Sequence, residues 1–340
     1  MKYLLALSFL FLLPQSPEEF PPLGTIDLYG NRTVSAAEIR GALPFHEGDA
    51  MPEAAFETKK HAAKQKLEAI PGIKSAFLTR VCCTQDHKSM LYVGVEEAVS
   101  PCLRFHPAPN GTVRLPTKMV KADHEVEAAW EKAILAGDAA EDDSQGHALG
   151  HDPGLRAAQL RYVTLAQAYR ANLLDVLHNS ADNRQRALAA EVLGYVKDKQ
   201  AVVGDLVAAM CDPSPEVRNN AMRTLVVFAR FAPKPPAAKI RIPQRPFIEL
   251  LNSCVWWDRN KSSAALAELT EQRDPALLAK MRKEALPSLM EMARWKDMGH
   301  AASSLLILGR IGGLSDEQME KALETGDREA ILEAAGKAGP

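Results

Sequence analysis

Aromatic residues are scarce in this sequence, and neither sign of charge dominates it. Phe, Trp and Tyr make up 6% of the 340 residues, which favours helices packed through Ala and Leu over a large β-sandwich. The formal net charge is -2, so the chain lacks the strong basic excess expected of a protein that coats nucleic acid. Hydrophobic residues nevertheless make up 46%, which is enough for folded cores, and the length allows two domains.

Long apolar runs are also missing, except for a short one at the N-terminus. Residues 3–13 are apolar with one exception, follow Lys2 and end at Pro14. This run is too short to cross roughly 30 Å of hydrocarbon as a helix, but it matches the apolar part of a secretory signal. We therefore expect residues 1–20 to be a signal peptide, or an N-terminal anchor if uncleaved, on a protein exported to the periplasm or cell envelope. A buried N-terminal helix is the alternative, which the prolines disfavour.

The cysteines are few and odd in number, and their spacing does not match a metal-binding knuckle. An exported protein can keep disulfides. A disulfide of Cys102 with Cys82 or Cys83 is the pairing that we consider, because all three lie in one small region predicted to form a sheet. Cys211 and Cys254 are expected to be buried thiols at helix ends.

Residues 24–98 carry signals for a small module of three strands and two helices. The first helix should begin at a capping box, in which the Ser35 hydroxyl accepts a hydrogen bond from the amide of Glu38. The second should begin at Pro52 and end before Pro71-Gly72. Alternation of apolar and polar residues predicts strands at Thr25–Tyr29, Ile73–Cys83 and Met90–Val95.

This ordered set of signals resembles a POTRA domain, the polypeptide-transport-associated module of bacterial envelope proteins. The resemblance is carried by "IDLYGN", "VSAAEIR", "IPGI" and "LYVGVEE", with Gly30, Gly48 and Gly72 where the family pattern has glycines. It implies a three-stranded sheet under two helices, and capture of a peptide along an exposed sheet edge by strand addition. The alternative is that neighbouring chain covers this edge. The implied edge residues are Ala76, Phe77, Leu78, Thr79, Arg80 and Val81.

Residues 99–154 are predicted to hold a hairpin, a helix and an acidic linker. Asn110-Gly111 is a strong turn signal for a hairpin, and it lies between two short stretches with strand character. Asp123 is expected to cap a helix. The stretch after this helix, residues 137–153, is acidic and rich in glycine, which is typical of a linker.

Residues 155–336 repeat a pattern of paired helices at about 40-residue spacing, which is typical of a helical solenoid. Four segments can be aligned so that a small residue is followed by leucine four positions later. Small residues let helices approach closely, and the leucine fills the groove between them. An irregular helical bundle is the alternative. The aligned residues are Ala189, Ala221, Ala265 and Ser304, with Leu193, Leu225, Leu269 and Leu308.

The stretch from Asp212 to Ala221 has the pattern D-x-x-x-x-V-R-x-x-A. This pattern resembles HEAT repeats of the PBS-lyase type. The resemblance implies that Asp212 and Arg218 tie neighbouring repeats together and have no catalytic role. The order of the two regions is similar to that of bacterial HEAT-repeat proteins that begin with a POTRA-like domain.

Two further features have functional interpretations. Residues 232–246 are rich in proline, contain no acid and should form a loop that protrudes between two helices. The loop either binds an acidic partner or is a solvated insertion. Trp256-Trp257 follows a predicted helix and either packs between repeats or lies at an interface. The basic residues of the loop are Lys234, Lys239, Arg241 and Arg245.

The sequence contains no glycine-rich phosphate loop, nucleophile elbow or Cys-x-x-Cys motif. We predict an α+β module of β-α-α-β-β order followed by an all-α solenoid of antiparallel helix pairs. We also predict a non-enzymatic adaptor with protein partners, no cofactor, no bound metal and no nucleic acid, which meets a membrane only through an uncleaved N-terminal segment. The alternatives are a HEAT-like metal-dependent enzyme and a HEAT-like DNA-binding protein. The pairs His46-Glu47 and His124-Glu125, which could serve such an enzyme, lie outside the repeats.

Overall fold

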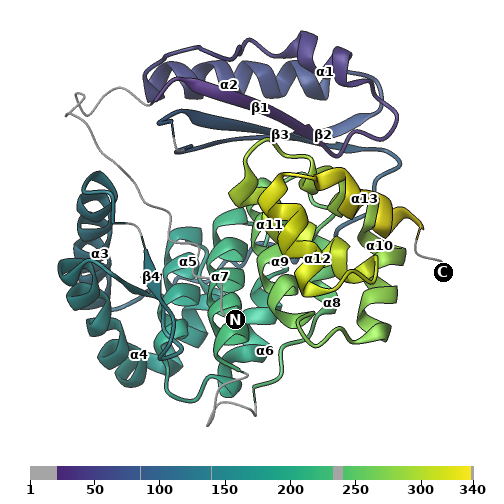
Figure 1. The fold of residues 1–340 in the computed structure, drawn as a ribbon. Coiled ribbons are helices and arrows are strands. Elements are labelled where there is room, and N and C mark those ends of the chain that lie inside the picture. Colours follow the sequence, from purple (N-terminus) through teal and green to yellow (C-terminus); the bar gives the residue numbers. More distant parts are fainter. Residues whose placement is uncertain (1–20, 85, 139, 233–239, 338–340) are drawn as a thin grey trace. The chain divides into compact units, whose positions relative to one another are not determined.

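The structure is a computed structural model that describes residues 21–84, 86–138, 140–232 and 240–337 (Figure 1). These residues form two compact units. The helical unit consists of Arg104–Pro243, and the mixed unit joins the described residues up to Leu103 with those from Gln244 onward. The expected signal segment, residues 1–20, lies outside the described residues. The chain thus combines a small N-terminal sheet region with a helical-repeat region, as the sequence predicts at this level.

The N-terminal half of the mixed unit is a three-stranded sheet with two helices. Strand β3 lies between the other two strands, parallel to β1 and antiparallel to β2. Ser35 caps α1 by accepting a hydrogen bond from the amide of Glu38, as predicted. The elements in chain order are β1 (Leu23–Tyr29), α1 (Ala36–Ala42), α2 (Glu53–Glu68), β2 (Ile73–Val81) and β3 (Ser89–Glu97).

Side chains along the strands alternate between the two faces of this sheet, and each face is covered by different helices. Helices α1 and α2 cover one face, and helices of the C-terminal half lie on the other (Figure 1). The side chains buried between the first face and its two helices include Ile26, Ile39, Phe56, Leu67, Ala76, Leu78, Leu91 and Val93. The second face carries the buried rings of Tyr29 and Tyr92, so the helices on this face keep a large apolar area out of water.

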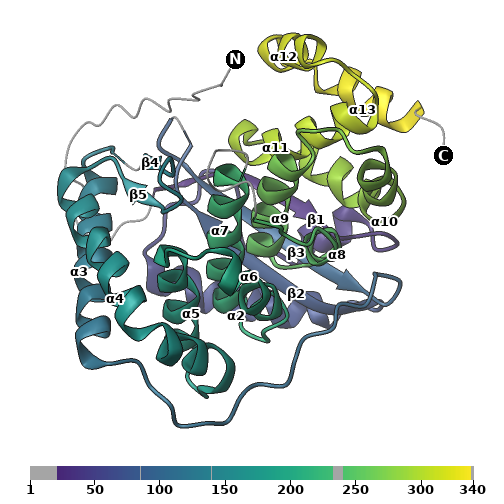
Figure 2. The ribbon, with the colours of Figure 1, turned by 90° about the horizontal axis from the view of Figure 1, so that it is seen from below.

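The C-terminal half of the mixed unit contains helices and no strand in its described residues. Helix α9 packs on β2 and β3, and α10 packs on β1. At the far end, α13 packs on α11, and α12 packs on α13 (Figure 2). The helices are α8 (Arg245–Leu250), α9 (Trp256–Leu269), α10 (Pro275–Ala293), α11 (Met298–Ile311), α12 (Asp316–Thr325) and α13 (Arg328–Lys337).

Aromatic rings form the contact between the second sheet face and these helices. The ring of Tyr92 stacks on Trp256 with centroids 5.1 Å apart and lies 5.0 Å from Trp295. Trp295 also meets Tyr29 edge-on at 5.6 Å. Gly94 permits the close approach, because a Cβ there would lie 2.0 Å from the carbonyl oxygen of Cys254. Three of the chain's four tryptophans, Trp256, Trp257 and Trp295, therefore lie where the two halves of the mixed unit meet.

The helical unit contains the first part of the repeat region. Helix α4 is bent at Tyr169, whose φ of -120° and ψ of 18° are not helical. The elements are α3 (Thr117–Leu135), β4 (Glu141–Asp142), β5 (Leu149–Gly150), α4 (Pro153–Asn179), α5 (Asn183–Val192), the 3-10 turn η1 (Leu193–Tyr195), α6 (Gln200–Ala209) and α7 (Pro215–Phe231).

A buried arginine recurs at the same place in three repeat helices. Arg186, Arg218 and Arg259 each stand four residues after the cap of α5, α7 and α9. Each donates a hydrogen bond of 2.6–2.8 Å to the carbonyl oxygen six residues before it. Those carbonyls belong to the turn that precedes the helix, so each arginine ties its turn to its helix. The D-x-x-x-x-V-R-x-x-A pattern in the sequence identifies only the middle arginine of this series, Arg218.

The arginines also correct the alignment of the repeats. Counted from the helix caps, the residues of α9 that correspond to Ala189 and Leu193 are Ser262 and Leu266. The alignment from sequence used Ala265 and Leu269 and was wrong by three residues. The reason is that α9 begins at Trp256, before Asp258, whose carboxylate accepts a hydrogen bond from Ser253 instead of capping the helix at position 258.

The hairpin predicted from Asn110-Gly111 is not formed. Residues 104–110 and 112–116 contain no strand, and the backbone of this segment bonds to the ends of helices. The amide of Gly111 donates to the carbonyl oxygen of Asn179 at 2.9 Å. The amide of His106 donates to the carbonyl oxygen of Cys211 at 2.7 Å. Gly111 does not form a turn but lets the backbone of this segment approach the end of α4 closely. A Cβ at position 111 would lie 2.4 Å from the carbonyl oxygen of Asn179.

The acidic linker predicted at residues 137–153 is also wrong, because its described residues pack into the helical unit. Leu149 is fully buried, and the carbonyl of Ala148 accepts a hydrogen bond of 2.7 Å from Tyr195. The acids that suggested a solvated linker are paired with arginines of α4 and α7. The pairs are Glu141 with Arg223, Asp142 with Arg156 and Asp143 with Arg230.

Lys199 is buried beneath this segment, and no carboxylate of the described residues pairs with its amine. It is 5% exposed, and its Nζ lies 5.1 Å from the ring centre of Phe228 and 5.7 Å from that of Phe231. The amine donates to the carbonyl of Val196 at 3.2 Å and lies 3.5 Å from Nδ1 of His147. Burial lowers the pKa of Lys199 from 10.5 to about 8, because the charged amine is poorly solvated there.

Replacing Lys199 by methionine is therefore expected to stabilise the helical unit at neutral pH, by about 1–3 kcal/mol. In the wild type the folded-state pKa lies below the unfolded value, so the unfolded chain binds more protons between these two values. The free energy of unfolding should then rise with pH through that window, by on the order of 3 kcal/mol. Guanidinium unfolding of both proteins from about pH 7 to pH 10.5 checks this. Equal pH dependence in the two proteins would contradict the account.

Candidate functional site

Strand β2 is an edge of the sheet, and half of its backbone faces away from β3. The sheet order puts β3 on one side of β2 and no described strand on the other. The amide of Ala76 donates to a side-chain oxygen of Glu68 at 3.1 Å, so it points away from β3. In an antiparallel ladder the N–H and C=O of one residue point to the same side, and the side alternates from residue to residue. The backbone groups of Leu78 therefore point outward as well.

Most side chains of the predicted edge, Ala76–Val81, pack on one of the two faces of the sheet. Ala76 and Leu78 are buried against the α1–α2 side. The guanidinium of Arg80 lies 4.1 Å from the ring centre of Phe56, donates to the carbonyl of Met51 and pairs with Glu53. Val81 and Phe77 are half-buried. The edge can therefore contact a partner mainly through its backbone and through Phe77.

A groove of about 190 Å³ follows this edge from α2 to α9. Phe77 and Trp257 form one wall, with ring centroids 6.1 Å apart in an edge-to-face arrangement. Thr79 lies in the same lining, is 6% exposed, and its hydroxyl has no hydrogen-bond partner among the described residues. The complete lining is Glu53, Phe56, Glu57, Lys60, Phe77, Leu78, Thr79, Arg80 and Trp257.

The tryptophan pair divides its roles between the core and this groove. Trp256 is buried, stacks on Tyr92 of the sheet and meets His300 of α11 edge-on at 4.9 Å, so it packs against the sheet as well as against a repeat helix. Trp257 is half-buried and lines the groove beside Phe77. No pattern in the sequence connects Trp257 with the sheet edge. The connection arises because the second sheet face packs on α9.

The cysteines are not joined as expected. Cys82 is bonded to Cys83, and Cys102 is free and exposed. Cys82 and Cys83 follow the end of β2, which lies beside the start of β3, whereas Cys102 follows the end of β3. A strand of nine residues spans roughly 26 Å, far beyond the ~7 Å that a disulfide allows between Cα atoms. Cys211 and Cys254 are half-buried thiols.

The predicted basic loop can be described only in part. Lys234 and Lys239 lie outside the described residues. The backbone amide of Arg241 donates to the side chain of Gln200 at 2.6 Å, within the helical unit. Arg245 begins α8 of the mixed unit, and its guanidinium pairs with Glu249 at 2.7 Å. The binding of an acidic partner by this loop remains a prediction.

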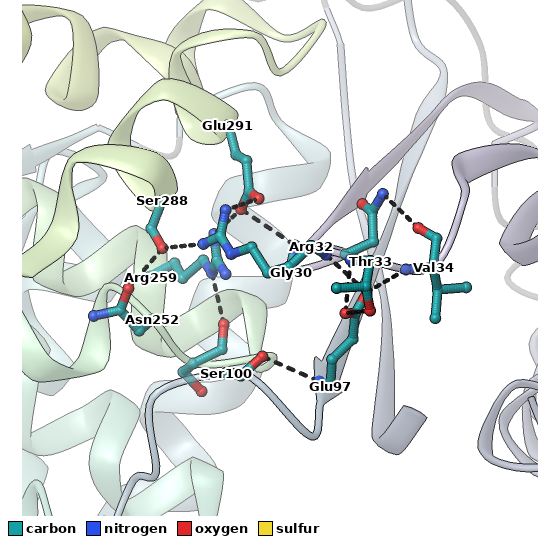
Figure 3. Close-up of polar contacts among 12 residues, drawn as sticks. Gly30, Arg32, Thr33, Val34, Glu97, Ser100, Asn252, Arg259, Ser288 and Glu291 are labelled. Atoms are coloured by element: carbon teal, nitrogen blue, oxygen red, sulfur yellow. Dashed lines mark hydrogen bonds and ion pairs between the residues drawn. The ribbon is translucent and has the colours of Figure 1, made fainter. Parts of the chain in front are cut away.

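A polar network supports the groove by fixing the sheet to α9 and α10 (Figure 3). Glu291 of α10 accepts hydrogen bonds from Arg32 at 2.5 Å, from Arg259 at 2.8 Å and from the amide of Gly30 at 3.2 Å. Arg32 also donates to Ser288 at 3.0 Å. The carboxylate thus accepts hydrogen bonds both from a fully buried arginine of α9 and from the backbone just after β1. These bonds hold α9 in place beside β2.

Glu97, at the end of β3, closes the turn that follows β1 (Figure 3). Its carboxylate accepts from the consecutive amides of Arg32, Thr33 and Val34 at 2.7–3.0 Å and from the Thr33 hydroxyl at 2.5 Å. Consecutive amides aimed at one point form a site for an anion. Burial raises the pKa of Glu97, but the hydrogen bonds from Thr33, Val34 and Arg32 together outweigh it, and the pKa is lowered below its ordinary 4.5.

Replacing Glu97 by glutamine is expected to destabilise the mixed unit by about 2–4 kcal/mol, because an amide group cannot accept all of these hydrogen bonds. Since the folded-state pKa of Glu97 is below the unfolded value, its stabilising effect is present above that value and is lost as the pH falls through the folded-state pKa. Unfolding measured from about pH 6 down to pH 3 should show the two proteins converging. A constant difference across this range would contradict the assigned role.

A match to a protein-family model supports part of the repeat region. A family model for HEAT repeats matches residues 171–239. Two solved structures align with 55% of this chain and 92% of their own: a designed armadillo repeat protein, at 17% identity and TM-score 0.36, and computationally designed armadillo repeat proteins for modular peptide recognition, at 16% and 0.35. A search of curated proteins found no match.

Neither a membrane-spanning helix nor a metal-binding cluster occurs among the described residues. No helix in this part of the chain is long and apolar enough to cross a membrane. No group of three or more His, Cys, Asp or Glu side chains is arranged to hold a metal ion in the same residues.

Proposed function

We propose that this protein is a non-enzymatic binding scaffold, exported to the cell envelope, that binds an extended segment of a partner protein at the edge of β2. The observation that carries the proposal is that the backbone groups of Leu78 face away from β3, beside a groove lined by Phe77 and Trp257. A segment added there would gain main-chain hydrogen bonds from the strand and side-chain contacts in the groove.

The proposed role assigns a POTRA-like character to the N-terminal sheet region. Support comes from two helices placed between the first and second strands, and from a sheet in which the last strand is central. This arrangement leaves β2 at an edge, as the resemblance implies for residues 76–81. The sequence of residues 1–20 supports export, which a cell-fractionation experiment on the full chain tests.

The helical region is assigned to HEAT-like repeats of antiparallel helix pairs that offer a second binding surface. The match at residues 171–239 supports this, as does the arginine that recurs at the same position in α5, α7 and α9. Helical repeats expose long surfaces on which protein partners bind.

The test is site-specific photo-crosslinking in intact cells. A photoreactive residue at Glu57, which is exposed on the groove rim, should give a discrete crosslinked partner protein. The same residue at Glu324, exposed on α12 away from the groove lining, is the matched control. No product from Glu57, or equal products from both positions, would refute binding at the β2 edge. Recovery of the protein in the cytoplasm would refute export.

A further inference from the structure

The free edge of β2 is interrupted by a side chain of the same unit. Glu68 is the last residue of α2, and its Oε1 accepts the hydrogen bond that Ala76 donates outward. The same oxygen lies 3.5 Å from Nζ of Lys64, one helical turn earlier. The link is short, since Gly72, with a φ of +97°, turns the chain sharply between the helix and the strand. A charged acceptor thus occupies the place that a partner strand would take at Ala76.

This position of Glu68 divides the edge into two parts. An added strand would bond to the outward groups of alternate residues, which are Ala76, Leu78 and Arg80. The amide of Ala76 is already used, whereas Leu78 offers its N–H and C=O beside the groove. Strand addition can therefore proceed from Leu78 toward Val81 and stops at Ala76. Side chains that block part of an edge are a known means of limiting unwanted strand pairing.

The groove beside Leu78 indicates which side chain the added segment carries. Its charged groups are internally paired, Glu53 with Arg80 and Glu57 with Lys60 at 2.9 Å, so it offers no unbalanced charge. Phe77 and Trp257 present aromatic surfaces, which favour an aromatic occupant packed in an offset or edge-to-face geometry. The hydroxyl of Thr79, buried in this lining without a partner, would gain a hydrogen bond from a polar tip such as that of tyrosine.

We propose that Glu68 ends a short strand-addition site, at which a partner segment pairs with residues 78–81 and places one aromatic side chain against Phe77 and Trp257. This inference rests on the proposed function and adds to it the length and the chemistry of the partner segment. It assigns Glu68 as a positioning residue and Trp257 as a contact residue for specificity.

The first test of the inference needs no partner. Amide hydrogen exchange, followed by NMR on the full chain, should show the Ala76 amide exchanging about tenfold faster when Glu68 is replaced by alanine. Glu68→Gln keeps an acceptor oxygen and should retain most of the protection. Unchanged exchange in Glu68→Ala would overturn the role of Glu68, whatever binds at the edge.

The second test uses random 12-residue peptides displayed on phage and selected against the full chain. Enriched peptides should share an aromatic residue and protect the Leu78 amide. Trp257→Ala should weaken their binding at least about tenfold, while Val99→Ala, at a site that is 63% exposed outside the groove, should leave it unchanged. Trp257→Phe keeps an aromatic wall and should bind nearly as well, which separates loss of contact from loss of folding.

The outcomes distinguish the inference from the function on which it rests. Peptides that protect Leu78 but bind equally well to Trp257→Ala and lack an aromatic residue would overturn the inference and leave edge binding in place. Exchange of the Ala76 amide that becomes slower still when a peptide binds to the wild type would also overturn it. Failure of every selected peptide to protect β2 would overturn both the inference and the proposed binding at this edge.

Discussion

Replacing Asp212 by alanine is expected to lower the free energy of unfolding of the helical unit by about 3–5 kcal/mol. Asp212 is 6% exposed and binds Arg186, which is 2% exposed, through two hydrogen bonds of 2.7 and 2.9 Å. It also accepts from the amide of Ser214 at 2.7 Å at the start of α7. Without the carboxylate, the guanidinium of Arg186 would remain buried with an unpaired charge. Native-state hydrogen exchange of the α5 and α7 amides measures the loss.

A double-mutant cycle separates the ion pair from the space that it fills. Arg186→Met alone leaves the Asp212 carboxylate buried and should be about as damaging as Asp212→Ala. The double variant removes both charges and should be less destabilised than the sum of the two single variants, by at least about 1 kcal/mol. Strict additivity would show that the pair does not couple the two repeats. Arg184→Met, at an exposed arginine of the same helix, α5, is the matched control.

Replacing Trp295 by alanine is expected to destabilise the mixed unit by about 3–5 kcal/mol, since a large buried ring is removed. Trp295 is 1% exposed and contacts Tyr29 of β1 and Tyr92 of β3. The loss should therefore appear at the sheet as well as in the helices. Hydrogen exchange of the β3 amides should report nearly the same loss of free energy as that of the α11 amides.

A matched control for this substitution is Trp130→Ala. Trp130 lies on α3 of the helical unit and is partly exposed, so the loss should be about 1 kcal/mol or less and should leave β3 unaffected. If Trp295→Ala destabilised the C-terminal helices while the exchange of β3 stayed unchanged, the shared core of the mixed unit would be refuted.

The local elements could be predicted from the sequence because their signals are local. Ser35 and Glu38 mark the start of α1, and Pro71-Gly72 marks the end of α2, within a few residues of the groups with which they interact. Alternation placed a strand at Thr25–Tyr29, inside β1. Helix periodicity and the Asp212 pattern were enough to predict a repeat region.

The core that joins the two halves of the mixed unit could not be predicted in this way. Its contacts link residues such as Arg32 and Glu291, which are 259 positions apart, and no periodic pattern relates them. The aromatic residues on the second sheet face looked like ordinary alternation. The unit boundaries at residues 103 and 243 therefore differ from the divisions at 98 and 154 that composition suggested.

The wrong expectations share a physical cause, which is that a long-range partner replaced the local one. Gly111 lets the chain approach Asn179 closely and does not form a hairpin turn. The acidic residues at 141–143 form ion pairs with arginines of α4 and α7. The β2 edge was implied by a family resemblance, but Trp257 joins it only because α9 packs on the sheet. Glu68, only eight residues from Ala76, carried no signal, since a glutamate at a helix end is ordinary.

The measurement that tests the central claim most directly is native-state hydrogen exchange of the full chain in increasing guanidinium. The claim is that the N-terminal sheet and the C-terminal helices share one core, which builds the groove from β2 and α9. The account predicts that the amides of Tyr92 and Val93 in β3 and of Ile307 and Leu308 in α11 open together, with the same free energy and the same denaturant dependence. Separate opening of β3 while α11 stays protected would contradict it.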